Sequence, residues 1–433
     1  MRAFTALSFT AVLIVSGAHA SSEQKSAAPE LSARQTETDE YTRYELLAPD
    51  TNSFRIRYEV TATTAGARFY FNPIRKGSVA SDEAVYDVMT GKPLEFQVVS
   101  GADARNDPLM PDAGKDTNYI KVQLARAVPQ DGQGRLLILK TYKDAKSYHR
   151  EGDAIVFARS LSIKRNSVVL PAGYEFVACN VPSQVLAEPD GRIGVSFMNA
   201  GPGEANLVIR AKPGAQTGPS AVPRAASSTL SWESPFPGET EKSRLAERAH
   251  QDRDIVYFLQ QPETHAFSLY HDYTESHPGV DKYLNIVRVG SVVSAPSAYM
   301  LETGEKLMTK IMSGTELTAA KIETEEPVTP TSQIVVIPFP AVKKGESLRL
   351  RISETYTAPA SYRLDGDELI FDRSFGRPRN AVVLPEGWYL TASSIPATLT
   401  QLGDNRIRLD FWNGRPDSID VLIKAKRRTK GGQ

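Results

Sequence analysis

The sequence has little of what metal-binding and nucleophilic enzymes usually display. Cys179 is its only cysteine, so no internal disulfide can form and the fold must be stable through packing alone. It contains no HExxH or CxxC pattern, no G-x-S-x-G nucleophile elbow and no glycine-rich phosphate loop. These absences argue against the commonest zinc enzymes, serine hydrolases and nucleotide-binding proteins, and we predict no catalytic residue, metal or cofactor.

The chain also lacks an excess of either charge. Its 51 basic side chains balance its 51 acidic ones, so the formal net charge at pH 7 is zero. A neutral balance creates no general field that would attract nucleic acid or an anionic membrane surface. We therefore expect no nucleic-acid partner.

No apolar run is long enough to cross a bilayer, but the N-terminus has the pattern of a secretory signal peptide. Arg2 precedes a short apolar stretch, and small residues at Ala18 and Ala20 occupy the two positions that signal peptidase reads. The sequence predicts cleavage after Ala20, no transmembrane segment after cleavage, and a periplasmic or secreted mature protein.

Comparison of the chain with itself reveals a duplication. Residues 147–180 match residues 361–394 at 15 of 34 positions, and both copies contain a Val-Val-Leu-Pro segment. Shorter matches extend through most of both halves at offsets of 213 or 214 residues. Units of this length are far longer than solenoid repeats, so each copy is predicted to be a complete domain.

The remaining segments are predicted to flank or connect these domains. They are polar, or rich in Ala, Ser, Pro and Gly, and they lack apolar periodicity. The basic tail is either a solvated end or a site for an acidic partner. The predicted order is a signal peptide (1–20), a disordered segment (21–40), repeat 1 (41–213), a flexible linker with a short helix over Thr240 to Asp254 (214–255), repeat 2 (256–426) and a basic tail (427–433).

Both repeats have the apolar period of two that is typical of strands. In repeat 1, for example, Phe54, Ile56, Tyr58 and Val60 alternate with polar residues. Turn-forming Gly, Asp and Asn residues punctuate such runs, and no long amphipathic helix lies between them. The sequence therefore predicts an all-β protein with two tandem homologous antiparallel β-sandwich domains.

Arginine and asparagine residues shared by both copies are the main candidates for a binding or architectural role. They could line a binding groove, or they could hydrogen-bond loop carbonyls and fix a corner of the sandwich. Their retention in two domains with otherwise divergent surfaces favours the architectural role. The candidates are Arg159, Arg165 and Asn166 in repeat 1 and Arg373, Arg379 and Asn380 in repeat 2.

Three other groups could carry chemistry or binding, but each has an ordinary structural explanation. The histidines have no counterparts in repeat 1, the acids flank a predicted hairpin tip, and the aromatics suit core or interface packing. Cys179 aligns with Ser393, which favours a small buried residue over a nucleophile. The groups are His265, His271 and His277 near Glu275, then Asp365, Asp367, Glu368 and Asp372, and finally Trp388, Tyr389 and Trp412.

The order of segments in each repeat resembles the non-catalytic, saddle-shaped N-terminal β domain of M1-type zinc aminopeptidases. In repeat 1 the resemblance rests on "KPLEF", "YIKVQLARAVPQDGQGRLLILKTY" and "VVLPAGYEFVACNVP". It implies the fold of that domain. The chain lacks the HExxH zinc helix and the GAMEN-type substrate loop of the family, so the resemblance implies no peptidase activity.

Three functional hypotheses remain open. The first is an exported, non-enzymatic binding or scaffold protein, in which a linker lets each domain engage a protein or glycan partner of the cell envelope. The second is an exported hydrolase of peptides or glycans, with a site between the two repeats that uses the acidic and histidine groups. The third is a permanent structural component of an envelope assembly.

Overall fold

The computed structural model describes residues 34–201, 203–214, 247–324 and 327–428. The predicted signal peptide, residues 21–33 of the predicted disordered segment, most of the predicted linker and residues 429–433 of the predicted tail lie outside the described residues. Within the described ranges, no helix has the length and apolarity that a membrane crossing requires.

Repeat 1 consists of three sheets. Its seven-stranded sheet has the order β12 (Gln184–Ala187), β13 (Ile193–Met198), β10 (Arg165–Val169), β1 (Glu37–Leu46), β2 (Ser53–Ala62), β7 (Gly134–Lys143) and β4 (Val79–Asp87). Its four-stranded sheet has the order β11 (Tyr174–Cys179), β14 (Ala205–Pro213), β9 (Ala154–Leu161) and β8 (Tyr148–Glu151). The third sheet and the short helices are β3 (Phe69–Pro73), β6 (Asn118–Gln123), β5 (Phe96–Ser100), η1 (Pro49–Thr51) and α1 (Gly101–Ala104).

Repeat 2 has the same three sheets in the same order, with one added edge strand, β19. Its large sheet has the order β19 (Lys306–Leu307), β18 (Val292–Met300), β22 (Leu348–Thr357), β16 (Ala266–Glu275), β15 (Asp254–Leu259), β25 (Arg379–Val383), β28 (Ile407–Trp412) and β27 (Thr398–Gln401). Its four-stranded sheet has the order β23 (Tyr362–Asp365), β24 (Glu368–Phe375), β29 (Ile419–Arg427) and β26 (Trp388–Ser393). The third sheet and the short helices are β17 (Lys282–Ile286), β21 (Gln333–Pro338), β20 (Lys310–Ser313), η2 (Pro262–Thr264) and α2 (Gly314–Ala319).

The duplication extends to local irregularities of the backbone. Asn52 after η1 and His265 after η2 both adopt left-handed geometry, with φ of 50° and 53°. Asp82 in β4 and Ala295 in β18 do so as well, with φ of 55° and 48°, and each lies at a bulge. Bulges mark fixed places where a strand bends. The prediction of two homologous all-β sandwich domains is confirmed.

One strand pair in each repeat differs from the antiparallel prediction. Strand β10 runs parallel to β1, and β25 runs parallel to β15, while the other pairs among the described strands are antiparallel. The chain leaves the four-stranded sheet after β9 or β24 and returns to the free edge of the first strand of the repeat. It enters there in the same direction as that strand, because it arrives by a crossover and not by a hairpin.

The predicted division of the chain needs correction at four places. Residues 37–40 belong to β1, although residues 21–40 were expected to be disordered, and β15 begins at Asp254, inside the predicted linker. Residues 247–253 contain a turn and no helix, so the described part of the segment Thr240 to Asp254 does not form the predicted helix. The carbonyls of Ala249 and His250 accept hydrogen bonds from Arg165, at 3.0 Å each, instead of serving a helix. Arg427 ends β29 and does not begin a tail.

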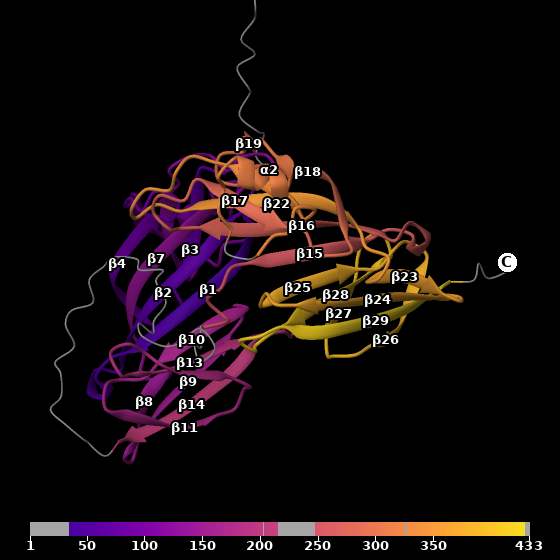
Figure 1. Ribbon diagram of the computed structural model, residues 1–433. Helices are drawn as coiled ribbons and strands as arrows, with labels where there is room; N and C mark the ends of the chain where they lie inside the picture. Colours follow the sequence, from indigo (N-terminus) through magenta and orange to yellow (C-terminus); the bar gives the residue numbers. More distant parts are fainter. Residues whose placement is uncertain (1–33, 202, 215–246, 325–326, 429–433) are drawn as a thin grey trace, which may run out of the picture.

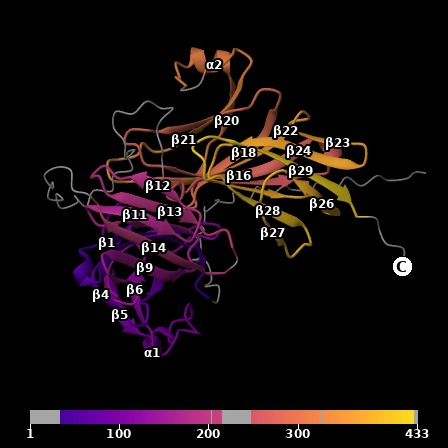
Figure 2. The same ribbon diagram turned by 90° about the horizontal axis from the view of Figure 1, so that it is seen from below.

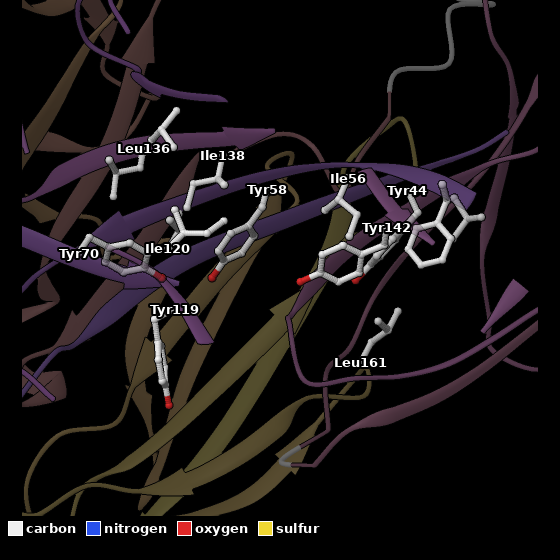
Figure 3. Packing of buried hydrophobic residues seen from close by; sticks show 14 of the residues in the cluster. Tyr44, Ile56, Tyr58, Tyr70, Tyr119, Ile120, Leu136, Ile138, Tyr142 and Leu161 are labelled. Atoms are coloured by element: carbon white, nitrogen blue, oxygen red, sulfur yellow. The ribbon is translucent and has the colours of Figure 1, made fainter. Parts of the chain in front are cut away.

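Each repeat has its own hydrophobic core between its large sheet and its smaller sheets. In repeat 1, Tyr58 from β2, Tyr70 from β3, Ile120 from β6 and Ile138 from β7 converge and are all buried (Figure 3). These are the alternate apolar positions that the period of two predicts. The opposite face of the large sheet stays available for contact with other parts of the chain.

The two repeats lie directly against each other. Repeat 1, in indigo to magenta, meets repeat 2, in orange to yellow, near β1 and β15 (Figure 1). Helices α1 and α2 lie at opposite ends of the molecule (Figure 2). The sequence did not predict whether the two repeats pack together, and their direct packing makes the junction between them the natural place to search for a site.

Candidate functional site

Main-chain hydrogen bonds join the two repeats in a nearly reciprocal way. The N–H of Ser347 donates to the carbonyl of Met89 at 2.9 Å, and the N–H of Gln133 donates to the carbonyl of Leu301 at 2.9 Å. Gln133 and Ser347 are equivalent positions of the two repeats. The junction is therefore nearly self-complementary, like the interface of a symmetric dimer built from two copies of one domain.

A buried ion pair also crosses this junction. Nε of Arg135 donates to Oε1 of Glu302, and the two side chains are only 6% and 1% exposed. Arg135 Nη2 also donates to Oγ of Ser347 at 3.0 Å, and that hydroxyl donates to the carbonyl of Val88 at 3.0 Å. A buried pair of this kind is strongly destabilising to break, because either partner alone is left as an uncompensated charge.

The centre of the junction is a single carboxylate held by three guanidinium groups. Oδ1 of Asp39 lies 3.1 Å from Nη2 of Arg165 and 2.6 Å from Nη2 of Arg379, and Oδ2 lies 2.6 Å from Nη2 of Arg349. We call these four residues the Asp39 cluster. Arg165 comes from repeat 1, whereas Arg349 and Arg379 come from repeat 2, so the cluster links the two domains.

The charges of the Asp39 cluster keep its carboxyl group ionised. Burial alone would raise the pKa of Asp39, but the positive charges of Arg165, Arg379 and Arg349 outweigh burial and hold that pKa well below its usual range. The cluster also fixes the backbone, since the carbonyl of Asp39 accepts from Arg165 at 2.8 Å and the carbonyl of Asp252 accepts from Arg379 at 2.9 Å. Asp39 and Asp252 are equivalent positions of the two repeats.

A cleft of about 390 Å³ opens beside the Asp39 cluster, and both repeats line it. This volume is within the range of small-molecule binding sites. Repeat 1 contributes residues of β1 and the start of β10, and repeat 2 contributes residues of β15, β25 and β28. The lining side chains are mostly charged and include Glu37, Glu40, Lys164, Asp254, Arg379, Asn380, Arg408, Asp410 and Trp412.

Two carboxyl groups of the cleft are shifted toward the neutral form. Burial, together with the neighbouring Glu37 carboxyl, raises the pKa of Glu40 to about 7, and Tyr58 donates a hydrogen bond to Oε1 of Glu40 at 3.1 Å. Burial also raises the pKa of Asp254. With its pKa of about 7, Glu40 carries a proton in part of the molecules near neutral pH, so the cleft can both donate and accept hydrogen bonds beside its permanent cations.

We expect the raised pKa of Glu40 to appear in the pH dependence of stability. Between the ordinary pKa of about 4.5 and the folded value of about 7, the folded protein binds more protons than the unfolded chain. The free energy of unfolding should therefore fall as pH rises through this window. Glu40→Gln should flatten that fall, measured by urea unfolding at several pH values. An unchanged slope in Glu40→Gln would contradict the assignment.

The comparisons with known proteins find resemblance only to part of a fold. The M1 zinc metallopeptidase from Deinococcus radiodurans is 11% identical at a TM-score of 0.28, over 43% of this chain and 44% of that one. The aminopeptidase N family protein from Idiomarina loihiensis is 11% identical at a TM-score of 0.25, over 40% and 29% of the two chains. The chain thus spans less than half the length of these structures, and the match lies in their non-catalytic part.

This finding confirms the weak resemblance predicted from the sequence. The resemblance concerns only the fold of part of this chain. No family model and no curated protein matches the chain. What the chain does must therefore be inferred from its own residues.

The structure brings two of the six predicted site residues together. Arg165 and Arg379, which are equivalent in the two repeats, meet at Asp39. Asn166 and Asn380 occupy matching corners, where each side-chain amide donates to the carbonyl three residues earlier, at 2.7 and 2.9 Å. Asn380 also lines the cleft.

The other two predicted arginines lie inside the separate domains. The guanidinium of Arg159 lies over the rings of Tyr44 and Phe54, and that of Arg373 lies over the equivalent rings of Tyr257 and Phe267. Neither of them reaches the cleft. These arginines pack against the cores of the two repeats, one in each.

The three histidines do not converge. His265 Nδ1 lies 3.0 Å from the carbonyl of Tyr362, His277 Nδ1 lies 2.6 Å from Glu275, and His271 is buried against tyrosine rings. Burial lowers the pKa of His271 to about 3, so this histidine is neutral. Among the described residues, no group of three or more His, Cys, Asp or Glu side chains is placed to hold a metal ion.

The acidic and aromatic groups are also dispersed. Asp367, at the hairpin between β23 and β24, pairs with Lys426 at 3.1 Å and lies away from the residues that line the cleft. Trp388 is buried, Tyr389 is 42% exposed on β26, and only Trp412 reaches the cleft. Cys179 is half-buried, with Sγ 3.4 Å from Oγ of Ser183.

Sequence reasoning missed the centre of the site. Asp39 and Glu40 fell in the segment predicted to be disordered, and Arg349 drew no attention within an alternating strand. One signal was present, since Asp39 and Asp252 match at the 213-residue offset, just before the first strand match of each repeat. That match would have extended the first repeat to Asp39.

Proposed function

We propose that this protein is an exported, non-enzymatic binding protein that holds a polar ligand of the cell envelope, from a glycan or a protein, in the cleft between its repeats. Export is supported by the signal-like pattern that ends at Ala20. The observation that carries the proposal is the cleft of about 390 Å³, which neither repeat can form alone.

The lining of the cleft suits a ligand with several hydrogen-bonding groups. Arg408 makes a planar pair with Asp410, with Nη2 2.7 Å from Oδ1, and both side chains are about 30% accessible. The Asn380 amide and the Glu40 carboxyl, whose pKa is raised to about 7, add further donors and acceptors. Such fixed, planar groups recognise hydroxyl, amide or carboxylate groups with defined geometry.

Trp412 supplies the aromatic part of the proposed site. It lines the cleft and also a neighbouring cavity of about 360 Å³, so it stands between the two. Its indole Nε1 is buried and has no hydrogen-bond acceptor among the described residues. A buried donor without an acceptor is costly, and a ligand oxygen could satisfy it.

Binding can be tested by titrating the full-length protein with fragments of envelope glycans and with envelope peptides, followed by tryptophan fluorescence and calorimetry. We expect one class to bind, and we expect Trp412→Met and Arg408→Met to weaken it by roughly 10-fold or more, since a lost polar partner costs about 1–3 kcal/mol. Met stands at the position equivalent to Trp412 in repeat 1, at Met198, so the strand accepts it. Tyr389→Ala, on exposed β26, is the matched control and should bind normally.

If both cleft variants bind as tightly as the wild type, the ligand does not occupy the cleft and the proposal is wrong. Failure of every glycan and peptide to bind would equally count against it. The Tyr389 control separates a specific loss from a general weakening of aromatic surface contacts.

One observation favours the alternative of an exported hydrolase of peptides or glycans. Glu40 has the raised pKa of a general acid and lies in the cleft near other carboxylates. The residues that first suggested this hypothesis, Asp367 and His271, do not line the cleft. A hydrolase screen with the wild type and Glu40→Gln distinguishes the two functions. Turnover by the wild type that Glu40→Gln abolishes would show that the protein is a hydrolase and not a binding protein.

A further inference from the structure

Repeat 1 holds an internal carboxylate at the corner between β7 and β8. Oδ2 of Asp144 accepts hydrogen bonds from the hydroxyls of Ser147, at 2.7 Å, and Ser78, at 3.2 Å. It also accepts from Nη1 of Arg159 at 3.2 Å, while Oδ1 accepts from the N–H groups of Lys146 and Ser147 at 3.1 Å each. The Asp144 carboxylate thus satisfies a set of donors that the fold gathers at this corner.

Repeat 2 has the same corner without the acid. Ala358 stands at the position of Asp144, 214 residues later. The backbone is preserved, because the N–H of Ala358 donates to the carbonyl of His265 at 2.9 Å, as the N–H of Asp144 donates to the carbonyl of Asn52 at 2.9 Å. Replacing Asp by Ala at an unchanged backbone removes the acceptor and leaves its donors in place.

The guanidinium of repeat 2 has kept its position but has lost its partner. Arg373 lies 5.3 Å from the ring of Phe267, as Arg159 lies 5.5 Å from the ring of Phe54. Arg373 is only 9% exposed, and its Nε and Nη1 atoms have no hydrogen-bond acceptor among the described residues. A buried guanidinium without an anion is strongly unfavourable.

The two hydroxyl donors of this corner are present as well. Ser361 and Ser291 occupy the positions of Ser147 and Ser78. The turn that carries Ser291 is the same in both repeats, since its N–H donates to the carbonyl of Arg288 at 3.0 Å. Within the part of the chain that the structure describes, neither hydroxyl takes part in a hydrogen bond.

A second cation lies near Arg373. Burial and the charge of Arg373 lower the pKa of Arg288, and Nη2 of Arg288 reaches the carbonyl of Ser374 at 3.4 Å. The buried acid of this region, Glu354, is already engaged by the amide of Asn285 at 2.8 Å and by the hydroxyl of Tyr356. The two arginines therefore share no protein carboxylate among the described residues.

We propose that repeat 2 binds a small carboxylate at the niche formed by Arg373, Ser361, Ser291 and Arg288, in the place where repeat 1 holds its own Asp144. The ligand is a free carboxylic acid anion or the carboxylate of a larger molecule, because the equivalent donors of repeat 1 bind one carboxylate group, that of Asp144. This Arg373 niche runs from the buried Arg373 to the exposed Arg288, and none of its four residues lines the cleft.

The test measures thermal unfolding of the full-length protein in rising sodium acetate, with ionic strength held constant by sodium chloride. Acetate should raise the Tm of the wild type with the logarithm of its concentration above the Kd. Ala358→Asp should raise the Tm by about 3 °C or more in the absence of acetate and should remove the acetate response. Asp144→Ala should lower the Tm and should gain an acetate response from repeat 1.

Two results would overturn the proposal. If the niche cannot accommodate an anion, Ala358→Asp buries an unpaired carboxylate and lowers the Tm. Equal acetate responses of the wild type and Ala358→Asp also overturn it. Arg373→Met provides a second measurement, since it should abolish the acetate response of the wild type. To separate the two sources of the ligand, formate and acetate are compared with short peptides that end in a free or an amidated carboxyl group.

Discussion

Asp39→Asn is expected to lower the free energy of unfolding by about 3–5 kcal/mol, since it leaves Arg165, Arg349 and Arg379 buried without their anion. Asn suits the left-handed backbone of Asp39, which has φ of 53°, so the substitution changes charge and little else. Urea unfolding of the full-length protein at pH 7 measures the loss.

The control is Asp82→Asn, at an exposed aspartate with φ of 55°, which should change stability by less than about 0.5 kcal/mol.

The pKa of Asp39 is lowered in the folded protein, so the contribution of Asp39 to the free energy of unfolding is complete above the ordinary pKa and declines as pH falls through the folded value. The gap between the wild type and Asp39→Asn should therefore narrow only in strong acid. Equal stability of the two proteins at pH 7 would contradict the role given to the Asp39 cluster.

The ion pair between Arg135 and Glu302 should show the second large effect. Arg135→Met or Glu302→Met alone should each cost about 3–5 kcal/mol, because the side chains are only 6% and 1% exposed and either partner alone remains buried and charged. Repeat 1 itself has Met89 at the position equivalent to Glu302, so a methionine suits this place in the fold.

The double variant Arg135→Met, Glu302→Met should recover most of this loss, since it removes both charges together. A double-mutant cycle by urea unfolding gives the coupling energy, which we expect to exceed about 2 kcal/mol in favour of the pair. Additive losses in the double variant would mean that the two side chains do not interact across the junction.

The fold could be predicted because its signals are local or repeated. The alternation from Phe54 to Val60 fixes the buried face of β2, and the match between the two halves fixes the number of domains. The parallel pairing of β1 with β10 was not predictable in this way, because residues 41–45 meet residues 165–169 across more than a hundred residues of chain. Alternation describes the faces of a strand and not its neighbours.

The site was harder to predict because its logic is non-local. Asp39, Arg165 and Arg379 are separated by long stretches of sequence, and each is an ordinary surface residue by type. Only the packing of one repeat against the other removes them from water and so strengthens the electrostatic interactions between them. The shared arginines did mark two of these positions, but the acid that brings them together lay in a polar segment without periodicity.

Differences between the repeats mark where the two domains have taken separate roles. Repeat 2 has Trp412 where repeat 1 has Met198, and Glu302 where repeat 1 has Met89. The first change places an aromatic ring at the cleft, and the second places a carboxylate in the junction. The backbone equivalence of the repeats provides a natural control for each substitution, since the residue of one repeat can be placed in the other.

The central claim is that the Asp39 cluster and its neighbours close the two repeats into one cooperative unit with a shared cleft. Differential scanning calorimetry of the full-length protein tests this directly. We predict a single unfolding transition whose calorimetric enthalpy equals the van't Hoff enthalpy. Two separate transitions in the wild type, unchanged in midpoint by Asp39→Asn, would show that the domains unfold independently and would contradict the account.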